Sequence, residues 1–126
     1  MRKSLRDFMV AANAVVTTHD VAAAMALVDD DSVLFVDVRD RGELETHGKI
    51  PGALHASRGM LEFHIDPASP FHISDLDSGK ALVFYCAGGG RSALAAQTAI
   101  EMGCENVAHI AGGFGAWMQA GGPVEK

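Results

Sequence analysis

The chain has 126 residues, of which 48% are hydrophobic and 6% aromatic, and its formal net charge at pH 7 is −6. This length is enough for one domain with a single core and too short for two. The negative charge and the lack of a run of Lys or Arg argue against nucleic acid and acidic membranes as partners, because phosphate groups bind to clustered positive charge.

Residues 1–16 predict an amphipathic helix that packs on a domain formed by residues 17–126. The apolar side chains that recur at helical spacing are Leu5, Phe8, Met9 and Ala12. Polar residues interrupt this apolar stretch, which is too short for a signal peptide or a membrane span. We therefore expect neither a cleaved leader nor a membrane anchor.

The first half of the domain is predicted to alternate helices and strands. The segment 17-TTHD-20 has the Thr-x-x-acid form of a capping box and predicts a helix that follows it through residue 28. The β-branched run at 32–38 predicts a strand that is buried on both faces of a parallel sheet. A polar helix at 40–47 and a short strand at 53–56 follow.

The second half continues this alternation around one long loop. A helix at 58–65 leads into residues 66–80, whose two prolines and small polar residues predict a loop. Long loops in small domains are often functional, so we expect this one to form the rim or lid of a site. The remaining elements are a buried strand at 81–85, a helix at 91–103, a buried strand at 107–110 and a final helix at 112–122.

This alternation predicts an α/β fold with a parallel sheet covered by helices on both faces. In such sheets, ligands bind beyond the carboxyl ends of the strands. Cys86 follows the strand at 81–85 directly. We therefore expect the site of this protein at Cys86.

The segment 86-CAGGGRS-92 predicts an anion-binding loop. The first N–H groups of a helix have no partners within it, and glycines allow the backbone to turn such groups toward one point. This arrangement, with the helix dipole, favours an anion, here the Cys86 thiolate or a group on its sulfur. The pKa of the thiol is then lowered, and Arg91 adds positive charge if it points inward. We interpret Cys86 as a nucleophile that requires no histidine base.

Two other interpretations of this loop remain open. A glycine-rich turn can bind a nucleotide phosphate, but this one lacks the Gly-Lys-Ser/Thr of a P-loop and the Gly-x-Gly-x-x-Gly of a dinucleotide site. A buried, inert cysteine is also common. A lone cysteine with scattered histidines does not have the spacing of zinc ligands, so we expect no metal, and nothing in the sequence indicates a cofactor.

The second cysteine, Cys104, lies beyond the helix that begins near Arg91. At a helical rise of about 1.5 Å per residue, roughly 18 Å separate it from Cys86, which is too far for a resolving thiol. Two free thiols in an acidic globular chain predict a reducing, cytoplasmic location.

Three motifs in order make the chain resemble the single-domain rhodaneses, a sulfurtransferase family, from about His19 to the C-terminus. The segment 36-VDVRDRGELETHGKIPGALHA-56 resembles the family's Asp-x-Arg…Glu…Gly-x-Ile-Pro-Gly-Ala signature. The segment 86-CAGGGRS-92 resembles its Cys-x-x-Gly-x-Arg-Ser active-site loop. The segment 112-GGFGAWMQAGGPV-124 resembles its Gly-Gly…Trp…Gly-x-Pro-Val motif.

The resemblance implies a rhodanese-like α/β fold, with a central parallel sheet of about five short strands, and an enzyme of the thiosulfate sulfurtransferase type. Cys86 would attack the sulfane sulfur of a donor such as thiosulfate and hold it as a persulfide. A thiophilic acceptor, which is cyanide, a cellular thiol or a protein, would then take the sulfur. The persulfide would be bound by the rest of the loop, Ala87, Gly88, Gly89, Gly90, Arg91 and Ser92.

Two alternatives to this activity stay open. The domain could carry sulfur or bind a partner protein without free turnover. It could also be a Cys-dependent phosphatase of the related fold, but those enzymes resemble Cys-x5-Arg, whereas Cys86 and Arg91 are spaced as Cys-x4-Arg. The shorter loop makes a smaller cradle, which matches one sulfur atom better than a phosphoryl group.

Several polar residues outside the loop are candidates for a role at the site or in its support. Asp37 and Arg39 match family positions and are expected to support the structure. Arg58 matches a place from which related proteins direct a side chain toward the site, where it could bind the substrate anion; a solvated arginine at a helix start is the alternative. His55 and His109 lie in short apolar strands and are expected to be hydrogen-bonded core residues rather than bases.

Overall fold

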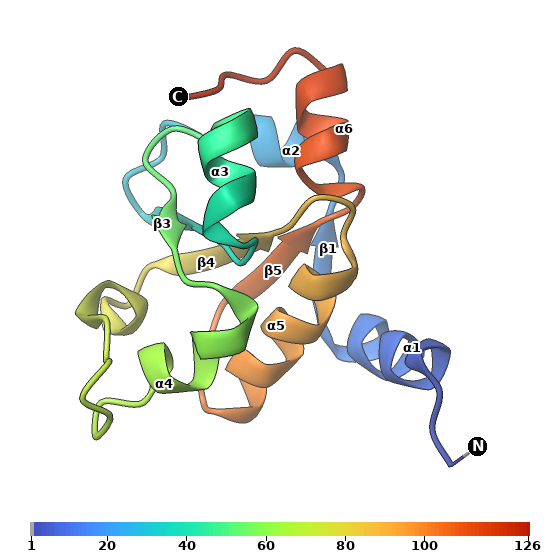
Figure 1. Cartoon of the computed structure of the whole chain (residues 1–126), viewed down its shortest axis with the longest axis vertical. Helices are drawn as coiled ribbons and strands as arrows, with labels where there is room; N and C mark the ends of the chain where they lie inside the picture. The colour runs from blue at the N-terminus through green and yellow to red at the C-terminus, as the bar shows by residue number, and fades with distance from the viewer. Residues whose placement is uncertain (1) are drawn as a thin grey trace.

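The centre of the molecule is a parallel sheet of five strands in a computed structural model that describes residues 2–126 (Figure 1). The strands are β1 Thr17–His19, β2 Val33–Asp37, β3 Leu54–His55, β4 Ala81–Tyr85 and β5 Val107–Ile110. Their order across the sheet is β1-β5-β4-β2-β3, and each neighbouring pair is parallel. The predicted α/β fold with about five short parallel strands is confirmed.

Helices cover both faces of this sheet (Figure 1). The α-helices of the described residues are α1 Leu5–Val15, α2 Val21–Met25, α3 Arg41–His47, α4 Leu61–Ile65, α5 Gly90–Glu101 and α6 Gly113–Gln119, and the 3-10 helices are η1 Arg58–Met60 and η2 Ser74–Asp77. Residues of α4 and α5 form a core on one face, and residues of α2 and α6 form a second core on the other.

Strand β4 contributes to both cores because its side chains alternate between the two faces. Leu82 and Phe84 join the core under α5, whose buried alanines allow the helix to lie close to the sheet. Val83 and Tyr85 join the core under α6. Burial on both faces fixes β4 in the middle of the sheet, and Cys86 follows at its carboxyl end.

The predicted capping box at 17–20 is wrong, because Thr17–His19 is strand β1, which pairs with β5 at the edge of the sheet. Pairing with β5 outweighs the local helix signal, and threonines are well suited to a strand. Helix α2 begins directly after Asp20, whose side chain accepts a hydrogen bond of 2.8 Å from the amide of Ala23. The strand was missed because it is short and polar.

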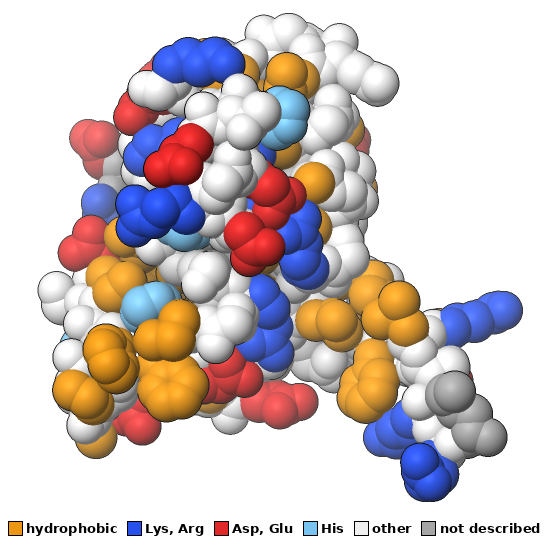
Figure 2. Space-filling view, viewed as in Figure 1, with side chains coloured by type: hydrophobic (Ala, Val, Ile, Leu, Met, Phe, Trp, Pro, Cys, Tyr) orange, Lys and Arg blue, Asp and Glu red, His pale blue; other side chains and the backbone are white. Residues whose placement is uncertain are grey.

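Helix α1 contacts α5 outside the sheet, as Figure 1 shows at the end of the molecule that holds the N-terminus. Ser4 and Asp7 form a capping box at its start, and Ala12 is buried. Leu5 and Phe8 are exposed, and Figure 2 shows hydrophobic side chains gathered over this helix. Within residues 2–126, no helix has both the length and the apolar character needed to cross a membrane.

The loop at 66–80, predicted to form the rim or lid of a site, does not lie over Cys86. The loop connects α4 to the amino end of β4, whereas Cys86 follows the carboxyl end. It folds back on α4 through a hydrogen bond of 2.9 Å from the amide of Ile73 to the carbonyl of His64. With residues 102–106, it lines a cavity of about 330 Å³ at the opposite end of β4.

Candidate active site

The loop at 86–92 directs hydrogen-bond donors at the sulfur of Cys86. The amide of Gly89 lies 3.1 Å from Sγ, and the amide of Ser92 lies 3.4 Å from it. The thiol of Cys86 in turn donates to the hydroxyl oxygen of Ser92, which lies 3.5 Å from Sγ and which can donate to the sulfur once the thiol has ionised. The loop forms because β4 ends in the core and α5 begins only a few residues later, so the first amides of α5 face the strand end.

These donors change the acidity of the thiol. Cys86 is 1% exposed, and this burial acts to raise its pKa. Hydrogen bonds from Ser92, Gly89 and Gly88 act in the opposite direction and outweigh the burial. The pKa of Cys86 is therefore lowered from its ordinary value, because the loop stabilises a negative charge on the sulfur.

The three consecutive glycines do not contribute equally to this geometry. Gly89, the residue before α5, has a φ of +106°, which favours glycine. A Cβ atom at Gly89 would also lie 3.4 Å from the amide nitrogen of Gly112. Gly88 and Gly90 lack a positive φ, and no atom lies within 4 Å of a Cβ placed at either position. Only Gly89 therefore requires glycine for the backbone turn that aims the amides.

The start of α6 is hydrogen-bonded to the backbone of the loop at 86–92. The amide of Phe114 donates to the carbonyl of Cys86 at 2.7 Å, and the amide of Gly115 donates to the carbonyl of Ala87 at 3.0 Å. Gly113 has a φ of +60°, and a Cβ atom there would collide with the carbonyl of Cys86. Gly113 thus allows α6 to approach the loop backbone closely.

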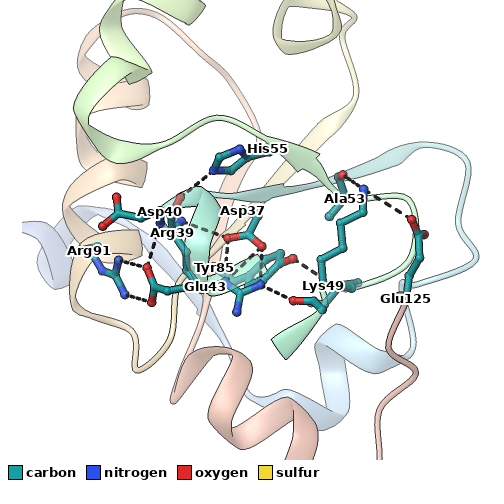
Figure 3. Close-up of polar contacts among 12 residues, drawn as sticks. Asp37, Arg39, Asp40, Glu43, Lys49, Ala53, His55, Tyr85, Arg91 and Glu125 are labelled. Carbon is teal, nitrogen blue, oxygen red and sulfur yellow. Dashed lines mark hydrogen bonds and ion pairs between the residues drawn. The ribbon is translucent and has the colours of Figure 1, made fainter. Parts of the chain in front are cut away.

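Arg91 is fixed by α3 and does not point at the sulfur. Its guanidinium donates to the two carboxylate oxygens of Glu43 at 2.8 and 2.9 Å, as Figure 3 shows. Glu43 also accepts a hydrogen bond of 2.8 Å from the amide of Asp40. The hydrogen bonds from Arg91 lower the pKa of Glu43 to about 2. Our sequence analysis missed the role of Glu43, although the Asp-x-x-Glu capping pattern at 40–43 could have indicated its direction.

Asp37 and Arg39 form a buried ion pair beside the loop (Figure 3). The guanidinium Nε lies 3.0 Å from one carboxylate oxygen of Asp37, and a terminal nitrogen lies 2.7 Å from the other. The same terminal nitrogen donates to the carbonyl of Gly48 at 2.7 Å. The guanidinium carbon lies 4.3 Å from the ring centroid of Phe114, whose amide holds Cys86. The pair therefore connects β2 and the segment after α3 to the support of the loop.

The model of the rhodanese-like domain matches residues 20–120 of this chain. The chain belongs to the rhodanese-like domain family. Its match to a protein named sulfurtransferase from Allochromatium vinosum is 33% identical over 98 residues, which are 78% of this chain and 83% of that protein. The resemblance to the rhodaneses that the three sequence motifs indicated is therefore confirmed.

Two solved structures resemble this rhodanese-like chain over most of its length. A protein of unknown function from Rhodopseudomonas palustris, described as a possible tyrosine phosphatase, is 50% identical, with a TM-score of 0.96 over 99% of this chain and 96% of its own. The human single-domain sulfurtransferase is 29% identical, with a TM-score of 0.66 over 82% of this chain and 96% of its own.

The structure does not bring Arg58 of this rhodanese-like domain to the loop. Its guanidinium donates to Glu62 at 3.0 Å and to the hydroxyl of Thr98, on α5, at 3.2 Å. Both arginine candidates, Arg58 and Arg91, are thus occupied by partners other than Cys86. Cys104 is a free cysteine beside the cavity at the other end of β4.

The two strand histidines are hydrogen-bonded inside the domain. The Nε2 atom of His55 lies 2.7 Å from the carbonyl of Arg39. The Nδ1 atom of His109 lies 3.0 Å from the hydroxyl oxygen of Ser92, a contact that our sequence analysis did not anticipate. Within residues 2–126, no three His, Cys, Asp or Glu side chains are grouped so that they could hold a metal ion.

Proposed function

We propose that this protein is a sulfurtransferase that moves a sulfane sulfur, through a persulfide on Cys86, from a donor such as thiosulfate to a thiophilic acceptor. The observation that carries this proposal is the convergence of the Gly89 and Ser92 amides and the Ser92 hydroxyl on one sulfur atom. Membership in the rhodanese-like family and the sulfurtransferase names of two relatives support it.

The transfer takes place in two steps that return the enzyme to its starting state. In the first, the Cys86 thiolate attacks the outer sulfur of thiosulfate, a sulfur–sulfur bond forms, and the sulfur–sulfur bond of the donor breaks to release sulfite. In the second, the acceptor attacks the terminal sulfur of the persulfide, and Cys86 leaves as thiolate. The loop amides stabilise the negative charge on sulfur in both states, which is the role of an oxyanion hole in acyl transfer.

A phosphatase is the second candidate, because the Rhodopseudomonas palustris protein at 50% identity is described as a possible tyrosine phosphatase. The four-residue spacing from Cys86 to Arg91 argues against it. The Arg91 guanidinium is also bound to both carboxylate oxygens of Glu43, so it is not free to bind a phosphoryl group in this arrangement. We therefore rank sulfur transfer first.

Steady-state assays distinguish the two candidates. With thiosulfate and cyanide, we expect thiocyanate to form with ping-pong kinetics, and Cys86→Ser to abolish its formation. With a generic aryl phosphate, we expect no turnover. Aryl phosphate turnover without thiocyanate formation would reverse the ranking.

A carrier of sulfur for another protein would differ from an enzyme with free turnover in the second step. We expect small thiols to accept sulfur from Cys86, whereas a carrier would hold its sulfur in their presence and release it to a protein acceptor.

Two free cysteines suit a reducing compartment such as the cytoplasm, which we propose as the location.

A further inference from the structure

A chain of polar contacts runs from the sulfur of Cys86 to the edge of the sheet. The hydroxyl oxygen of Ser92 lies 3.5 Å from Sγ and 3.0 Å from Nδ1 of His109. On the far side of the imidazole ring, Nε2 lies 3.2 Å from the hydroxyl oxygen of Thr18. Ser92 and His109 are buried, whereas Thr18 is exposed. The register of β1 and β5, which pairs Thr18 with His109, sets up the outer contact.

We propose that His109 is a positioning residue for the Cys86 nucleophile, because its Nδ1–H donates to Ser92 and thereby directs the hydroxyl proton of Ser92 to the sulfur anion. This inference rests on the proposed role of Cys86. Thr18 completes the proposed arrangement with its hydroxyl, 3.2 Å from Nε2, as the donor in that contact, which corresponds to the neutral tautomer that carries its proton on Nδ1.

The hydroxyl of Ser92 has a single proton, and several acceptors compete for it. Three acceptors lie within reach of that hydroxyl, which are Sγ of Cys86, the carbonyl of Gly89 at 3.3 Å and an unprotonated Nδ1 of His109. A proton on Nδ1 removes the histidine from this competition. Of the two acceptors that remain, the charged sulfur forms the stronger hydrogen bond.

The surroundings of His109 keep it neutral while the thiol ionises. Burial lowers the pKa of His109, and His19 on β1 lowers it further. The charged group nearest Cys86 on α5 is Arg91, whose guanidinium pairs with Glu43 on α3. We expect substitutions at His109 to leave this pair intact, because Arg91 is hydrogen-bonded to Glu43 and His109 to Ser92, so a change in thiol acidity reports the hydrogen-bond chain.

The test is the apparent pKa of Cys86, measured from the ultraviolet absorbance of the thiolate as the difference between each variant and the same variant with Cys86→Ser. We expect Ser92→Ala to raise this pKa by about one pH unit, because it removes the hydroxyl. His109→Leu should raise it by a smaller amount, because the hydroxyl stays but loses the Nδ1–H bond that directs its proton to the sulfur instead of the carbonyl of Gly89. The double variant should raise it no further than Ser92→Ala alone, because His109 acts through Ser92. His109→Asn, which keeps an N–H donor toward Ser92, should restore a value near that of the wild type.

His55→Leu is the matched control, since His55 is also a hydrogen-bonded strand histidine but bonds to the carbonyl of Arg39. It should leave the pKa of Cys86 unchanged. A normal pKa in His109→Leu beside a raised one in Ser92→Ala would overturn the proposal. Additive increases in the double variant would also overturn it, because they would show that His109 acts independently of Ser92.

A second measurement uses only the wild-type protein, so it does not depend on whether the variants fold. The ¹⁵N chemical shifts of the His109 ring in the wild-type protein at pH 8 should show a neutral imidazole with its proton on Nδ1. A proton on Nε2 would contradict the proposal. Neither measurement uses a sulfur donor, so a failure to form a persulfide would reject the proposed function and leave this test standing.

Discussion

Arg91 is the one charged residue in the segment 86–92, and its pairing with Glu43 gives the loop a fixed electrostatic environment. The guanidinium binds both oxygens of the carboxylate, so its position relative to α3 is fixed. Its positive charge nevertheless lies near enough to Cys86 for the two groups to favour each other's charged forms. Arg91 therefore acts on the sulfur from a distance, while the amides of the loop contact it directly.

The Glu43–Arg91 pair predicts a stability that depends on pH. The folded pKa of Glu43 is about 2, below its ordinary value of 4.5, so the pair stabilises the fold fully above pH 4.5 and loses this contribution as the pH falls toward 2. We expect Glu43→Gln to lower the free energy of unfolding by about 0.5–1 kcal/mol at pH 7, because the pair is partly exposed. Urea unfolding of both proteins should show that this difference shrinks below pH 4.5. A difference that stays constant between pH 7 and pH 3 would contradict this account.

The close contact of Gly113 with the carbonyl of Cys86 predicts that one added methyl group at this position disrupts the site. Gly113→Ala combines a φ of +60° with a collision against the carbonyl of Cys86, so we expect a loss of about 3 kcal/mol or more in the free energy of unfolding. We also expect sulfur transfer to fall by about tenfold or more, because the loop amides move away from the sulfur.

Gly121 provides the matched control for that substitution. It has a φ of +77°, but no atom lies within 4 Å of a Cβ placed there. Gly121→Ala should therefore cost only the backbone strain, about 1–2 kcal/mol, and should leave sulfur transfer unchanged. If urea unfolding gave equal losses for the two variants, the close approach of α6 to the loop would not matter to stability.

At the scale of elements, the ion pair of Asp37 and Arg39 connects the end of β2 to β4 and α6, the strand and the helix that position the loop at 86–92. Tyr85 precedes Cys86, and the Arg39 guanidinium carbon lies 5.6 Å from its ring centroid. Phe114, on α6, stacks on Tyr85 with ring centroids 6.0 Å apart. The pair thus holds β4 and α6 in the relative position that closes the loop.

This arrangement predicts a large effect for Asp37→Asn. The substitution keeps the size of the side chain but leaves the buried guanidinium without a compensating charge, so we expect the free energy of unfolding to fall by about 3–5 kcal/mol. Asp31→Asn, at an exposed position, is the control and should change it by less than about 0.5 kcal/mol. Urea unfolding checks both values, and an effect below about 1 kcal/mol for Asp37→Asn would show that the pair does not support the loop.

The elements that the sequence predicts well are those with a strong local signal. β2 and β4 are continuous apolar runs, and buried parallel strands require that pattern. β1 has no such signal, since its polar residues form a strand only because β5 lies beside them. The loop at 66–80 has the composition of a functional loop, but composition does not determine at which end of the sheet a loop lies.

At the scale of the whole molecule, the sheet brings together residues that lie far apart in the chain. Cys86 and its loop could be predicted because their chemistry is contiguous in the sequence. Glu43, His109 and Gly113 could not be assigned to the same site, since they reach it through the packing of α3, β5 and α6. Arg58 shows the converse, because its position in a motif did not determine that it would bind Glu62 and Thr98.

The measurement that tests the central claim most directly is the intact mass of the folded protein after incubation with thiosulfate. We expect the mass to increase by one sulfur atom and to return to its original value when cyanide is added. Cys86→Ser should show no increase. A wild-type protein that remains folded, with Cys86 reduced, and gains no sulfur would contradict the account.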